Sequence, residues 1–121
     1  MALINYTQDF PITGNSAFMR IIWPNMANGD TGEPFTLADY CDRSAQVEGT
    51  FGAGGIVVIE GNNETTATNW RTLNDPYSNA ISITTAKIEA VSELVVAIRP
   101  KVTAGDGTTS VTVSMLVRKN K

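Results

Sequence analysis

Apolar and polar side chains alternate with a period of two along much of this chain. Residues 44–51 and 109–118 follow this alternation closely, which is typical of strands with one buried face. Three other segments are almost continuously apolar and rich in β-branched or aromatic residues, namely residues 16–23, 56–60 and 95–98. The pattern predicts strands in all five segments, with residues 16–23 buried on both faces.

Turn-forming residues separate these segments at intervals of about ten residues. Gly52-Ala-Gly-Gly55 and Ala104-Gly-Asp-Gly107 have hairpin chemistry, so we expect each to join two paired strands. Residues 25–34 form a long irregular loop in this interpretation, and residues 85–93 a loop or single turn. Seven or eight short strands indicate a single antiparallel β-sandwich or jelly-roll-like domain over residues 15–121.

The first 14 residues form a distinct segment. Ile4, Tyr6, Phe10 and Ile12 occupy even positions, which indicates an extended conformation. We interpret residues 1–14 as an extended N-terminal arm that buries these four side chains against a neighbouring protein. The alternative is that the arm pairs with the domain's own sheet, and the sequence leaves both open.

The alternation also predicts which side chains fill the core. Inward positions of the expected strands carry large apolar residues. The predicted core contains Phe18, Ile21, Val47, Val57, Ile59, Trp70, Val96, Ile98, Val113 and Met115.

Composition excludes most catalytic chemistry. The 121 residues include no histidine and one cysteine, Cys41, so serine triads, histidine-bearing zinc sites and internal disulfides are excluded. The carboxylates Glu48 and Glu60, on strands expected to pair, are better explained as a solvated sheet face than as a glycosidase pair. We therefore expect no catalytic residues and no enzyme activity.

Ligand signals are similarly weak. The loop residues Asn28, Asp30 and Glu33, or Asp106 in a second loop, offer oxygen ligands for calcium but lack dense acidic spacing. The glycine clusters lack the Gly-Lys-Ser/Thr motif of a phosphate loop. We expect no metal site and no cofactor.

The charge balance limits the possible partners. Nine Lys and Arg against 12 Asp and Glu give a net charge of −3, without the basic patch that nucleic acid requires. No apolar run approaches the length of a transmembrane helix, and no basic residue precedes Arg20 as in a secretory signal. Nucleic acid and membrane are not expected partners, and synthesis in the cytoplasm is expected.

Three runs resemble a family of small virion proteins of tailed bacteriophages, the capsid decoration or cement proteins. They are DRSAQVEGTFGAGGIVVIEGNN at residues 42–63, NWRTLNDP at 69–76 and IRPKVTAGDGTT at 98–109. The resemblance spans residues 17–118. It implies a β-sandwich on the outside of the phage capsid, bound to the major capsid protein, stabilising the shell and assembled as a homotrimer. Ile4, Tyr6, Phe10 and Ile12 would then be the capsid contacts.

A smaller resemblance suggests other functions. Residues 58–63 and 69–73 look like the core of discoidin-type carbohydrate-binding sandwiches, which would use exposed aromatic residues. Trp23, Trp70 and Tyr77 are the candidates for such sugar contacts. A carbohydrate-binding module and a tail-associated virion protein remain the alternatives to capsid decoration.

Overall fold

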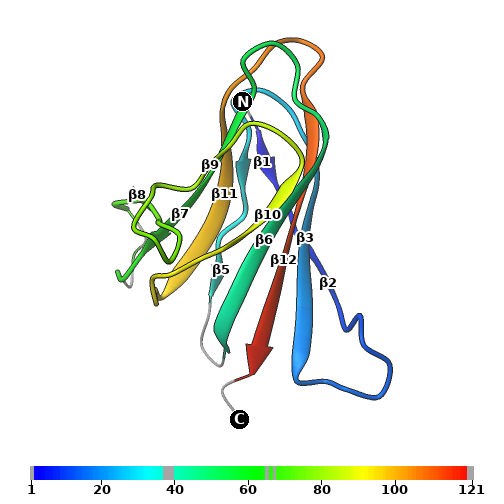
Figure 1. Ribbon diagram of the computed structural model, residues 1–121, viewed down its shortest axis with the longest axis vertical. Coiled ribbons are helices and arrows are strands. Elements are labelled where there is room, and N and C mark those ends of the chain that lie inside the picture. The colour runs from blue at the N-terminus through cyan, green and yellow to red at the C-terminus, as the bar shows by residue number, and fades with distance from the viewer. Residues whose placement is uncertain (1, 37–39, 65, 67, 120–121) are drawn as a thin grey trace.

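The protein folds as two β-sheets packed face to face (Figure 1). The computed structural model describes residues 2–36, 40–64, 66 and 68–119, with Cys41 described by its backbone alone. No helix occurs within these ranges, and almost all strand pairs are antiparallel. The predicted all-β sandwich is therefore confirmed.

The five-stranded sheet contains most of the long strands and is antiparallel throughout. Its spatial order is β10, β6, β12, β3 and β2. The bounds are Lys87–Ala90 (β10), Tyr40–Thr50 (β6), Ser110–Lys119 (β12), Phe18–Met26 (β3) and Thr7–Asp9 (β2). The strand that comes last in sequence, β12, is the central strand of this sheet.

The seven-stranded sheet follows the order β1, β4, β11, β7 and β8, with β5 paired to β11 and β9 paired to β7. Among the strand pairs of the described residues, only β1 and β4 run parallel. The bounds are Leu3–Ile4 (β1), Thr31–Gly32 (β4), Phe35–Thr36 (β5), Ile56–Asn62 (β7), Arg71–Thr72 (β8), Ser82–Ile83 (β9) and Ala97–Ala104 (β11).

Two connections predicted as hairpins cross between the sheets. Residues 51–55 lead from β6 in one sheet to β7 in the other, and residues 105–109 lead from β11 to β12 in the same way (Figure 1). The hairpin prediction is wrong because the apolar faces of β6 and β7 meet across the core. Positive φ at Gly52 (72°) and Gly54 (69°) serves this crossing as well as it would serve a hairpin.

The core lies between the sheets and matches much of the predicted set. Of the predicted residues, Ile21, Val47, Val57, Ile59, Ile98, Val113 and Met115 are buried. Phe18 and Trp70 are half-buried, and Val96 is 46% exposed, so Val96 does not belong to the core. Trp23, Met26, Ile81 and Ile83 are fully buried.

Two local predictions also need correction. Residues 18–23 alternate between half-buried and buried, because the outer face of the five-stranded sheet is open rather than covered by another layer. The segment expected to be a loop at residues 85–93 contains β10, which pairs with β6 from Lys87 to Ala90. Its exposed, mixed side chains concealed a strand at the edge of the sheet.

The expected arm at residues 1–14 is divided between the two sheets and a loop. β1 pairs with β4, and β2 pairs with β3. Between them, the Tyr6 ring makes edge contacts with Trp23 and Phe35, at centroid distances of 6.0 and 5.6 Å. Residues 3–9 therefore pair with the domain's own sheets, and the protruding part is the loop at residues 10–17 that leads into β3 (Figure 1).

Candidate interaction surface

The outer face of the five-stranded sheet carries apolar side chains where an open sheet face normally carries polar ones. Ile22 on β3 lies opposite Ser114 on β12, and Ile88 on β10 lies opposite Gln46 on β6. Leu116 on β12 points to the same side. Ile88 is 60% exposed and Leu116 is 37% exposed. Ser44, Gln46 and Ser114 lie among these side chains, and Arg20 lies directly opposite Leu116.

The loop at residues 10–17 extends this apolar face. Pro11 and Ile12 line one hollow together with Ile88, Leu116 and Ser114. Phe10, at 55% exposure, lines an adjoining hollow within the loop that also includes Ile12, itself 45% exposed. We call the set Phe10, Ile12, Ile22, Ile88 and Leu116 the apolar patch. Its members come from the 10–17 loop, β3, β10 and β12.

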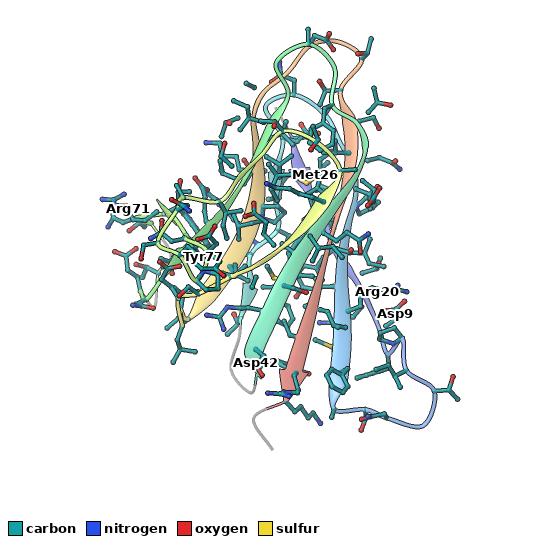
Figure 2. All side chains as sticks on the ribbon, viewed as in Figure 1. Asp9, Arg20, Met26, Asp42, Arg71 and Tyr77 are labelled. Atoms are coloured by element: carbon teal, nitrogen blue, oxygen red, sulfur yellow. The ribbon has the colours of Figure 1, made fainter. Side chains whose placement is uncertain are left out.

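The charges bordering the apolar patch are paired with one another. Arg20 donates from Nε and Nη2 to both carboxylate oxygens of Asp9, at 2.9 and 2.5 Å. These bonds hold the pKa of Asp9 below its usual value and fasten β2 to β3 (Figure 2). Arg118 pairs with Asp42 at the lower end of the sheet. A patch bordered by neutralised charges favours a partner that offers apolar surface.

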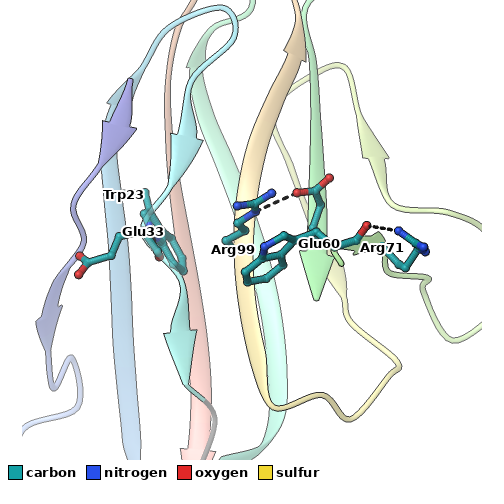
Figure 3. A network of polar contacts seen from close by, with 6 residues as sticks. Trp23, Glu33, Glu60, Arg71 and Arg99 are labelled. Carbon is teal, nitrogen blue, oxygen red and sulfur yellow. Dashed lines mark hydrogen bonds and ion pairs between the residues drawn. The ribbon is translucent and has the colours of Figure 1, made fainter. Parts of the chain in front are cut away.

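The opposite face of the sandwich is charged. Arg99 on β11 donates from Nε to Oε1 of Glu60 on β7 at 2.9 Å, and both side chains are largely buried (Figure 3). The Arg99 guanidinium lies 4.0 Å from the centroid of the Trp70 ring. Arg71 donates to the backbone carbonyl of Trp70. This face is held together by its own ion pair and cation–π contact.

The three aromatic candidates for sugar binding are not gathered into one site. Trp23 is fully buried and donates from Nε1 to the carbonyl oxygen of Glu33 at 2.9 Å, so it is a core residue. Trp70 is half-buried beside Arg99. Tyr77 is 86% exposed in the turn after β8 (Figure 2).

The candidate calcium ligands are used within the chain. Asp30 is 6% exposed and accepts backbone N–H bonds from Ala2 and Ala27 at 2.9 and 2.8 Å. Glu33 accepts from the Tyr6 N–H at 3.3 Å. Within the described residues, no three acidic or cysteine side chains gather as a metal cluster would require.

The carboxylates Glu48 and Glu60 lie in different sheets, contrary to the pairing expected for their strands. Glu48 is opposite Thr112, whereas Glu60 is opposite Arg99. The two therefore do not form a facing pair. No helix in the described part of the chain is long and apolar enough to cross a bilayer.

Sequence reasoning found part of the apolar patch and missed the rest. Phe10 and Ile12 were expected to be contact residues, and both are exposed. Ile4 and Tyr6, expected beside them, are half-buried against the core. Ile22, Ile88 and Leu116 were missed. The available signal was a large apolar residue at an outward position of each of these strands.

The fold and its exposed patch define a small two-sheet β-sandwich with one apolar outer face. No protein-family model matches the chain, and no curated protein sequence matches it significantly. Among solved structures, the crystal structure of the SPBc2 prophage-derived protein YomS is similar, with a TM-score of 0.62. The match covers 88% of this chain and 98% of that one at 11% identity, so the two share a fold.

Proposed function

We propose that the protein is a bacteriophage virion structural protein that decorates the outside of the capsid. The observation that carries the proposal is the match in architecture, over nearly the full length of both chains, to a protein of prophage origin. The resemblance of residues 42–63, 69–76 and 98–109 to phage decoration proteins also supports a phage origin, and the decoration role in this proposal comes from that resemblance.

The surface chemistry supports binding to another protein rather than catalysis. Protein interfaces are rich in aromatic and aliphatic side chains at their centres and poor in charge. The apolar patch has this composition, and its hydroxyl neighbours Ser44 and Ser114 can pair with polar groups of a partner. The chain contains no histidine. In this proposal the protein is not an enzyme and needs no cofactor.

The patch is assigned as the capsid-facing surface. Phe10 and Ile12 stand out on the 10–17 loop, where they reach a partner before the sheet does. Ile4 and Tyr6 contribute indirectly, because they fix the segment that leads into this loop. The ordered strand β2 immediately before Phe10 reduces the entropy lost when the loop docks.

A sedimentation experiment tests the proposal. Capsid shells assembled from the associated phage's major capsid protein are incubated with the purified chain and pelleted, and bound copies are located by electron microscopy. We expect the chain in the pellet and its density on the outer shell. Complete virions, imaged in the same way with the chain labelled, test the alternative. Label at the tail would support a tail-associated protein, and absence from both shell and tail would overturn the proposal.

A matched pair of variants identifies the surface. Phe10→Ser combined with Ile12→Ser should abolish sedimentation with the shell while leaving the melting temperature unchanged. The control, Lys101→Glu on the opposite face, should still sediment. Binding that survives the loop variant but is lost in the control would place the contact on the seven-stranded sheet.

The carbohydrate-binding alternative makes a different prediction. It requires Trp70 and Tyr77 to contact sugar, although Arg99 already occupies the space over the Trp70 ring. Retention on a glycan array that is lost on Trp70→Ala, with the fold intact, would favour that alternative.

A further inference from the structure

The second feature of this surface is the outer edge of β10, which pairs with no other strand in the described part of the chain. We call it the free edge. β10 is the outermost strand of the five-stranded sheet and pairs on one side with β6. The Val91 N–H donates to the Arg43 carbonyl at 3.2 Å, which fixes the alternation of the ladder. The N–H and C=O groups of Lys87 and Glu89 therefore point toward β6, and those of Ile88 and Ala90 point toward the free edge.

The side chains on this edge are complementary to themselves. Lys87 and Glu89 lie on one face of β10, two residues apart, with Nζ and Oε2 separated by 3.4 Å. Ile88 lies on the other face and is 60% exposed. When an antiparallel copy is placed with its two-fold axis at Ile88, each Lys87 faces the Glu89 of the second copy.

We propose that the protein forms a two-fold homodimer, rather than the homotrimer that the resemblance implies, in which β10 pairs with β10 of a second copy. Ile88 and its counterpart form the central hydrogen-bonded pair, exchanging both backbone bonds. Lys87 and Glu89 of opposite chains form the flanking non-hydrogen-bonded pairs, where side chains approach most closely. The two Lys87 and two Glu89 side chains then form two ion pairs, one on each side of the two-fold axis.

This arrangement explains why a lysine at the edge does not exclude pairing. A lysine on an exposed edge strand normally discourages association, because a copy would bring two like charges together. Here the antiparallel register brings Glu89 opposite Lys87, so the charge favours one alignment. A shift by one residue would place Lys87 opposite Ala90 and Glu89 opposite Ile88, and would lose both ion pairs.

The dimer also extends the apolar patch. Ile88 belongs to that patch, and pairing brings the two Ile88 side chains together on the same outer face. The two patches become one continuous surface across ten strands. The proposal does not depend on the capsid function, although it would double the surface available for docking.

Charge-exchange variants provide the test. Lys87→Glu places carboxylates opposite each other in a homodimer, and Glu89→Lys places ammonium groups opposite each other. Each single variant should dimerise at least about tenfold more weakly than the wild type. A mixture of the two single variants restores both opposite-charge pairs, and so should form heterodimers with the wild-type affinity.

The measurement is mass by light scattering and sedimentation equilibrium, from about 1 µM to about 1 mM chain. The control Lys101→Glu makes the same change in net charge as Lys87→Glu, but on the opposite sheet, and should dimerise like the wild type. Circular dichroism confirms that each variant is folded. A monomer throughout this range, a trimer, or a dimer that neither Lys87→Glu nor Glu89→Lys weakens more than the control does would overturn the proposal.

Discussion

The Thr109 hydroxyl donates a hydrogen bond to the carbonyl oxygen of Phe51 at 2.8 Å, joining two residues 58 positions apart. The Thr109 hydroxyl oxygen in turn accepts a hydrogen bond from the Asp106 N–H at 2.9 Å. Phe51 lies in the connection between β6 and β7, and Thr109 lies in the connection between β11 and β12. One buried hydroxyl therefore links the two chain crossings at this end of the sandwich.

Replacing this hydroxyl by a methyl group should destabilise the fold. Thr109 is 5% exposed, so Thr109→Val leaves two backbone groups without a partner in a place with little access to water. We expect the free energy of unfolding to fall by about 1–3 kcal/mol. Thr109→Ser keeps the hydroxyl and should lose less than half as much. Urea unfolding of both variants measures the difference, and equal losses would assign the effect to packing.

The neighbouring Asp106 makes the stability of the fold depend on pH. Hydrogen bonds from the Thr108 hydroxyl, and from the N–H groups of Ala53 and Thr108, lower the pKa of Asp106 to about 2. A carboxyl whose folded pKa is depressed stabilises the fold above its unfolded pKa of 3.8 and loses that contribution as the pH falls toward 2.

Asp106→Asn should therefore melt below the wild type at pH 6 and approach it at pH 2. Melting temperatures followed by circular dichroism at several pH values measure the convergence. A difference that stays constant across this range would show that the ionised carboxylate does not contribute.

Tyr6 should contribute to stability and Phe10 should not. Tyr6 packs edge-on against Trp23 and Phe35, whereas Phe10 is 55% exposed. We expect Tyr6→Ala to lower the free energy of unfolding by about 2–4 kcal/mol. Phe10→Ala should change it by no more than about 0.5 kcal/mol. Denaturant titration compares the two variants. An unchanged free energy of unfolding in Tyr6→Ala would mean that residues 3–9 are not part of the stable fold.

Gly32 should not tolerate a side chain. A Cβ there would lie 2.6 Å from Cδ of Pro100 and 2.7 Å from Cδ1 of Trp23, both in the packed interior or its border. Gly32→Ala should therefore destabilise the fold by about 1–3 kcal/mol. Gly107→Ala is the matched control, since no heavy atom lies within 4 Å of its added Cβ. Thermal unfolding of the two variants should show a clearly lower melting temperature for Gly32→Ala than for Gly107→Ala.

The strands were predictable because inward and outward positions alternate. Val111, Val113 and Met115 are all buried, as period two requires. Which strands pair was not predictable from the turns. Gly52 and Gly105 relieve backbone strain in a sheet-to-sheet crossing as readily as in a hairpin, and the choice depends on packing between distant segments.

The surface was harder to predict than the core. The alternation of inward and outward positions shows that Ile22 and Leu116 point outward. It does not show that they share a face with Ile12, which lies in a loop about a hundred residues before Leu116. That juxtaposition depends on the register of β3 against β12. Trp23 illustrates the opposite error, because an indole suits a sugar site or a core equally well.

The central position of β12 has a consequence for how the protein is made. β3 and β6 lie on either side of it and have no pairing with each other. While the chain grows on the ribosome, the first 109 residues include both strands but not the one that joins them. The five-stranded sheet can therefore close only after residues 110–119 emerge, and its closure depends on contacts between segments far apart in the sequence.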